Sequence, residues 1–91
     1  MLLLSGQALA GQYVEPDRVL NDVLSGYVIR IDVVDQRINR KAEVSVTYKQ
    51  EGEEKEVEVL YWTQSGSNVI LWLKEQPPQK TAVKMKIVEP D

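Results

Sequence analysis

Apolar and polar residues alternate with a period of two along most of the chain, from residue 27 to residue 88. This alternation is typical of β-strands that bury one face. Five apolar runs carry the pattern, at residues 29–33, 44–48, 57–61, 69–73 and 83–87. Because turn signals separate the runs, we expect a five-stranded antiparallel meander in which each strand pairs with the next. Such a sheet twists, and we expect it to form a small, partly open barrel.

A helical pattern precedes the sheet at residues 14–25. Pro16 lies where the first turn of a helix tolerates proline, apolar residues follow at helical spacing, and Gly26 ends the pattern. The segment predicts a short amphipathic helix that must pack on the sheet, because so short a helix is unstable alone. Residues 1–12 form an apolar N-terminal arm. The expected class is therefore α+β and mainly β, with residues 1–91 in one domain.

The predicted hairpin loops set the register of the sheet. With Gly52-Glu53 as a two-residue type II′ loop, Tyr48 faces Val57 and every inward residue of the first hairpin meets another apolar residue. The register matters because a shift of one residue would turn the whole apolar set to the other face.

The later loops extend the same register. A five-residue loop at residues 64–68 places Tyr61 opposite Leu71. The loop containing Pro77-Pro78 then places Leu73 opposite Val83, because neither proline can donate to a strand ladder.

With this register, large apolar residues of the second hairpin point away from the core, and two lysines of the last strand lie beside them. These residues form one candidate partner-binding patch: Leu60, Trp62, Ile70, Trp72, Lys84 and Lys86. The N-terminal helix or arm would cover the patch in one interpretation. In the other, the patch stays open and binds a protein partner or a second copy of the chain, since exposed apolar patches and tryptophans mark such sites.

Composition excludes much chemistry. The 91 residues contain no cysteine and no histidine, which removes disulfides, thiolate or imidazole metal ligands and imidazole acid–base steps. No phosphate-binding glycine loop or nucleophile motif occurs, and the paired acids alternate along strands as on any polar face. We therefore predict a non-catalytic interaction or assembly module without cofactor or metal, such as a homo-oligomer or an accessory subunit of a bacterial or viral complex.

Single-stranded nucleic acid is an alternative partner, because small β-barrels often bind oligonucleotides by aromatic stacking and basic residues. Trp62 and Trp72 would stack, and five basic residues would supply charge: Arg37, Arg40, Lys41, Lys84 and Lys86. The net charge of −3 disfavours this interpretation.

Export is a second alternative, because Ala8-Leu9-Ala10 resembles a signal-peptidase site. The preceding segment lacks a basic start and a long apolar run, so a cytoplasmic location is favoured. No stretch of the sequence reaches the roughly 18 apolar residues of a membrane span.

Overall fold

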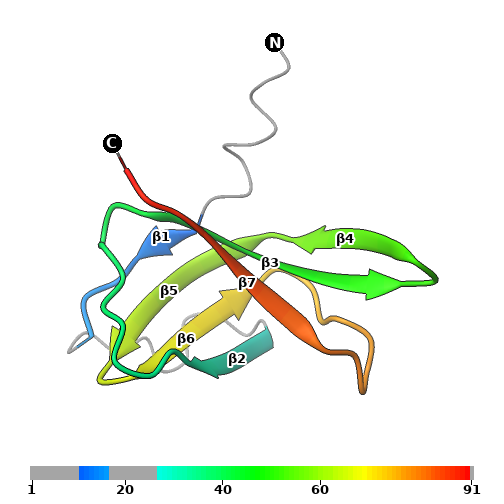
Figure 1. Ribbon diagram of the computed structural model, residues 1–91, viewed down its shortest axis with the longest axis horizontal. Helices are drawn as coiled ribbons and strands as arrows, with labels where there is room; N and C mark the ends of the chain where they lie inside the picture. Colours follow the sequence, from blue (N-terminus) through cyan, green and yellow to red (C-terminus); the bar gives the residue numbers. More distant parts are fainter. Residues whose placement is uncertain (1–10, 17–26, 91) are drawn as a thin grey trace, which may run out of the picture.

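The computed structural model describes residues 11–16 and 27–90 and consists of two β-sheets (Figure 1). Sheet A contains β1 (Gln12–Tyr13), β5 (Val59–Ser65), β6 (Asn68–Leu73) and β2 (Tyr27–Asp32), in that order. Sheet B contains β4 (Glu53–Val57), β3 (Glu43–Gln50) and β7 (Val83–Val88), in that order. The mainly β class is confirmed, and the two sheets do not form a closed barrel.

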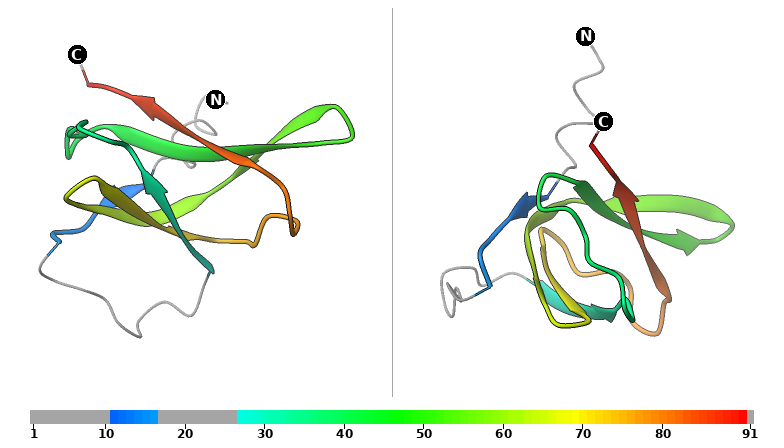
Figure 2. Two further views of the ribbon diagram at one scale, coloured as in Figure 1. Left: turned by 60° about the horizontal axis from the view of Figure 1, so that its bottom comes forward. Right: turned by 60° about the vertical axis from the view of Figure 1, so that its left-hand side comes forward.

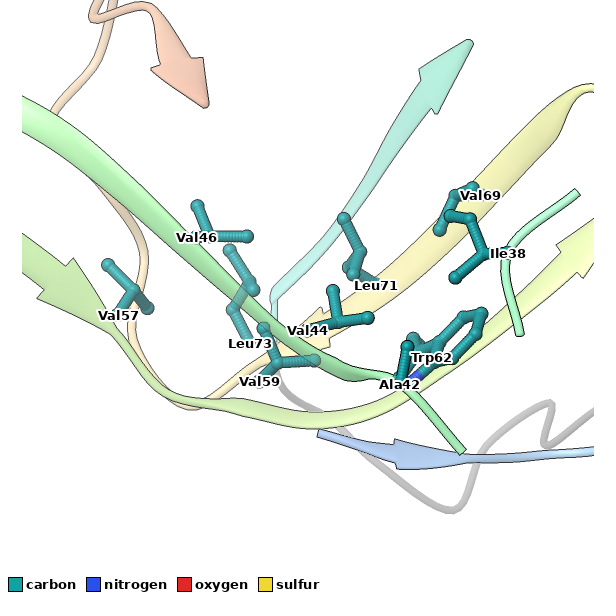
Figure 3. Close-up of a cluster of buried hydrophobic side chains, with 10 residues drawn as sticks. All are labelled: Ile38, Ala42, Val44, Val46, Val57, Val59, Trp62, Val69, Leu71 and Leu73. Carbon is teal, nitrogen blue, oxygen red and sulfur yellow. The ribbon is translucent and has the colours of Figure 1, made fainter. Parts of the chain in front are cut away.

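The two sheets face each other and bury the core between them (Figure 2). Alternate residues of β3 and β6 supply much of it, including Val44, Val46, Leu71 and Leu73, none of which is exposed. Figure 3 shows these side chains between the ribbons of the two sheets. Apolar residues spaced two apart thus line the interior in β3 and β6, as the alternation predicts.

One stretch of chain passes from sheet B to sheet A. β4 ends at Val57 and β5 begins at Val59, so a single residue separates them. The register of β5 against β6 then shifts between Val59 and Tyr61. An extra residue of this kind bends a strand and exchanges its two faces. Odd-numbered residues therefore face the core before the shift, at Val57 and Val59, and the even-numbered Trp62 faces it afterwards.

The residues around β1 join the two sheets on one side of the molecule. The Gly11 N–H donates to the carbonyl of Val44 in β3 at 3.0 Å, and the Val14 N–H donates to the carbonyl of Trp62 in β5 at 2.8 Å. Only glycine fits at position 11, since a Cβ there would lie 2.6 Å from Cγ1 of Val59. Within the described residues, β2 and β7 each pair with one strand only, and they are edge strands.

Two hairpins of the expected meander are confirmed and two pairings are wrong. β3 pairs with β4 and β5 pairs with β6, but β2 pairs with β6, and β7 pairs with β3. Leu73 consequently lies opposite Val59 and Tyr27, whereas Val83 lies opposite Tyr48. The alternation shows which side of a strand faces the core, but two strands with the same alternation are interchangeable as neighbours.

The predicted helix at residues 14–25 is not confirmed. Its residues 17–25 lie outside the described part of the chain, and residues 14–16 are not helical. Of the predicted arm, residues 1–10 also lie outside it. Gln12, however, belongs to β1, a parallel strand beside β5 that the sequence pattern did not indicate.

The first hairpin turns one residue earlier than predicted. Gln50 pairs with Glu53, so the loop is Glu51-Gly52, with φ angles of 52° and 83°. Two positive φ angles are typical of a type I′ turn rather than type II′. Tyr48 now faces Lys55 instead of Val57, a shift of two residues that leaves every side chain on its predicted face.

Replacing Glu51 with asparagine is expected to raise the free energy of unfolding by about 0.5 to 1 kcal/mol, because asparagine tolerates the left-handed conformation that Glu51 adopts. Urea denaturation followed by circular dichroism would measure the gain. Glu51→Gln is the matched control, since it removes the same charge without favouring a positive φ. An equal gain in both variants would contradict the conformational explanation.

Candidate interaction surfaces

The predicted partner-binding patch does not form one surface. Trp62 lies opposite Leu71 and is completely buried in the core, whereas Trp72 lies opposite Tyr61 on the other face of sheet A. The predicted pairing of Tyr61 with Leu71 is therefore wrong by one residue. The physical reason is the register shift before Tyr61, which turns Trp62 inward while Trp72 keeps its outward direction.

Trp62 is a core residue in every respect that the structure describes. Its ring meets the ring of Tyr13 edge to face, with centroids 4.9 Å apart. Figure 3 shows the indole beside Ala42, close to Ile38. A partner cannot reach this side chain while the two sheets stay packed.

The two lysines of the predicted patch lie on the other sheet. Lys84 and Lys86 belong to β7 and pair with Thr47 and Ser45 of β3. They point outward on sheet B, so they are not beside Trp72 or Ile70. Glu56 pairs with Thr47 from the opposite side, which gives this face the mixed polar character of an ordinary solvated surface.

The outer face of sheet A keeps part of the predicted apolar character. Trp72 lies between Tyr61 of β5 and Val28 of β2 in one row across three strands, and Ile70 lies in the next row. Trp72 is only 8% exposed, although it is not part of the core cluster. Val28 is 51% exposed, so the accessible end of the row is on β2.

Exposed apolar side chains lie along the β2 segment, on both faces of the strand and in the turn after it. The structure describes four large hydrophobic residues as exposed, and three of them lie in or just after this strand: Tyr27 at 46%, Val28 at 51% and Val34 at 64%. Sequence reasoning missed this surface. The available signal was the pairs Val28-Ile29 and Val33-Val34, where two adjacent apolar residues interrupt the alternation and one of each pair must face outward.

A basic loop precedes β3 and is held by a buried side chain. Gln64 is 2% exposed, and its Oε1 accepts a hydrogen bond from the Ile38 N–H at 3.0 Å. Its Nε2 donates to the carbonyls of Gln36 at 2.7 Å and Gly66 at 3.1 Å. The side chain thus joins the loop before β3 to the β5–β6 turn.

Three cations lie on this loop. Arg37, Arg40 and Lys41 line a hollow of about 690 Å³ together with Tyr13. Arg40 is 5.8 Å from the centre of the Tyr13 ring, and its Nη1 is 2.7 Å from a carboxylate oxygen of Glu15. That ion pair is exposed and weak, so the loop offers positive charge to an anionic ligand.

The described part of the chain holds no group of three acidic, histidine or cysteine side chains arranged for a metal ion. It also contains no helix long and apolar enough to span a bilayer. Comparison of the chain with protein-family models, with curated proteins and with solved structures found no match.

Proposed function

We propose that the chain is a non-catalytic, cytoplasmic interaction module that binds a protein through β2. The observation that carries the proposal is the exposure of apolar side chains on both faces of β2, Tyr27 on the inner face and Val28 on the outer face, with Val34 exposed in the turn after the strand. Exposed apolar side chains on an edge strand are a common feature of protein-interaction sites.

The position of β2 supports the same proposal. It is an edge strand among the described residues, and no described strand bonds to the backbone donors and acceptors on its outer side, which an approaching strand could use. Another edge strand, β7, alternates its apolar residues with Lys84 and Lys86 and ends at a single exposed valine, Val88. In this proposal the two sheets act as a small, partly open barrel, and partners bind at the β2 side of its opening.

A photo-crosslinking amino acid at position 28 tests the proposal. We expect Val28→benzoylphenylalanine to give a defined covalent adduct in a lysate of the source organism, because the side chain lies at the proposed contact. The matched control is the same substitution at Val88, which is exposed to the same degree on the other sheet. Adducts at neither position, or equal adducts at both, would overturn the proposal.

The basic loop favours a second candidate function, the binding of single-stranded nucleic acid. Arg37, Arg40 and Lys41 would contact phosphates, and Tyr13 is the one aromatic ring that lines this hollow among the residues the structure describes. Fluorescence anisotropy of a labelled oligonucleotide should then rise on titration at low salt and fall as salt is added. An Arg37→Glu variant that binds as well as the parent would exclude this loop as the site.

A further inference from the structure

We infer that the protein bound at β2 is a second copy of this chain, with the two β2 strands pairing antiparallel across a two-fold axis. The inference rests on the proposed function and names its partner. A two-fold interface uses the same residues from both copies, so the strand must be complementary to itself. The charges and apolar residues of β2 meet this requirement in one register.

The backbone of β2 determines which residues can bond to a second strand. The Val33 N–H donates to the carbonyl of Ser67 at 2.8 Å and continues the ladder between β2 and β6. Antiparallel ladders alternate, so Ile29 and Ile31 also direct their backbone groups toward β6. Arg30 and Asp32 lie between them and direct their N–H and C=O groups toward the free edge.

The register centred on Ile31 pairs opposite charges. In it, Arg30 of each copy lies opposite Asp32 of the other, in a position where the two residues exchange backbone hydrogen bonds. Symmetry produces the pair twice. Centring the axis on Arg30 instead would place two guanidinium groups opposite each other, which disfavours that register.

The same register covers the exposed apolar residues. Val28 of each copy then lies near the turn that holds Val34 of the other, two residues after β2 ends, and these residues are 51% and 64% exposed in the single chain. The Val34 N–H donates to Asp32 Oδ1 at 3.0 Å, so the contact between Val28 and Val34 is made by side chains and does not extend the ladder. On the inner face, Ile29 lies opposite Val33 and Ile31 lies opposite its own counterpart. These three inner residues are half-buried and already pack against the core. Pairing would join the two copies of sheet A into one continuous sheet.

A charge exchange tests the pairing. The parent should sediment as a dimer at about 100 µM, whereas Arg30→Asp and Asp32→Arg should each be monomeric, because each places like charges opposite each other twice. Mixing the two variants in equal amounts should restore a dimer, since both charge pairs re-form between different chains. The Arg30→Asp/Asp32→Arg double variant should dimerise by itself for the same reason. Lys86→Glu on β7 is the control and should leave the dimer intact.

A disulfide tests the position of the axis independently. The chain has no cysteine, and residues at a non-hydrogen-bonded antiparallel pair have Cα atoms about 4.5 Å apart, a distance that a disulfide can span. Under mild oxidation, Ile31→Cys should form a covalent dimer in high yield. Met85→Cys, also half-buried on an inner face but on β7, should not.

The outcomes separate this inference from the proposed function. A monomeric parent, a dimer that persists in Arg30→Asp, or a failure to dimerise on mixing would overturn the β2 pairing. If the parent is monomeric and the crosslinker at position 28 still captures a different protein, the proposed function stands and this inference fails. If the chain is monomeric and captures nothing, both fail.

Discussion

Replacing Trp62 with alanine is expected to lower the free energy of unfolding by about 3 to 5 kcal/mol, the range typical of a buried aromatic residue reduced to alanine. The side chain is completely buried, it packs against Tyr13, and it fills the space between β5 and the loop before β3. Since small domains have a total stability of only about 5 to 15 kcal/mol, this variant should be largely unfolded in mild urea.

Urea denaturation followed by far-ultraviolet circular dichroism measures the loss without depending on the missing indole. Trp62→Phe should cost clearly less, because the ring volume is mostly kept and the Trp62 Nε1 has no hydrogen-bond partner in the described residues. Val88→Ala on the surface should change stability by no more than about 0.5 kcal/mol. A loss of less than about 1 kcal/mol in the free energy of unfolding of Trp62→Ala would contradict the core position of the indole. Trp62 would then again be a candidate for the partner-binding patch predicted from the sequence.

Replacing Gln64 with leucine is the second large expected effect, a loss of about 2 to 4 kcal/mol. The reason is that the buried Ile38 N–H and the part-buried Gln36 carbonyl lose their partner, and a fully buried polar group left unpaired costs about 1 to 3 kcal/mol. Leucine has a similar volume, so a cavity contributes little. Hydrogen exchange at the Ile38 amide should accelerate more than exchange in β3.

A Gln64→Glu variant should have a free energy of unfolding that depends on pH. The ionised carboxylate would still accept from the Ile38 N–H, but it would face the carbonyls of Gln36 and Gly66 without a proton to donate. Burial and these carbonyls should raise the pKa of the new carboxyl above its value of about 4.3 in the unfolded chain. Relative to the parent, the variant should therefore be most stable below pH 4 and lose stability as pH rises through the raised pKa. No change in the relative stability between pH 4 and pH 7 would contradict the hydrogen bonds assigned to Gln64.

The sequence predicted the correct face of the sheet for some residues of the candidate patch and the wrong face for Trp62. Ile70 and Trp72 do point outward on sheet A, because β6 has no irregularity and its alternation can be followed directly. Trp62 was assigned to the wrong face because a single extra residue near Leu60 reverses the alternation of β5. Residues 59–62 are apolar without a break and no glycine or proline marks the shift, so the sequence shows that the alternation is interrupted here but does not show where it reverses.

The β2 surface could have been found in part from the sequence. Val28 precedes Ile29, and Val34 follows Val33. Since adjacent residues of a strand point to opposite faces, one apolar side chain of each pair must point outward. What the pattern cannot indicate is that β2 lies at the edge of its sheet. In the predicted meander its neighbour was β3, whereas the structure pairs it with β6 and places no other described strand beside it.

The amino-acid sequence alone determined that this is a mainly β protein, where its hairpins turn to within a residue, and which face of most strands is buried. Those properties depend on neighbours along the chain, on the alternation of apolar residues and on turn residues such as Gly52. Only the tertiary structure decided which strands are neighbours, where β5 changes face, and that Trp62 is in the core while Val28 is at a free edge. These outcomes depend on how two twisted sheets pack together, and strands with the same alternation fit that packing equally well until their full set of contacts is made.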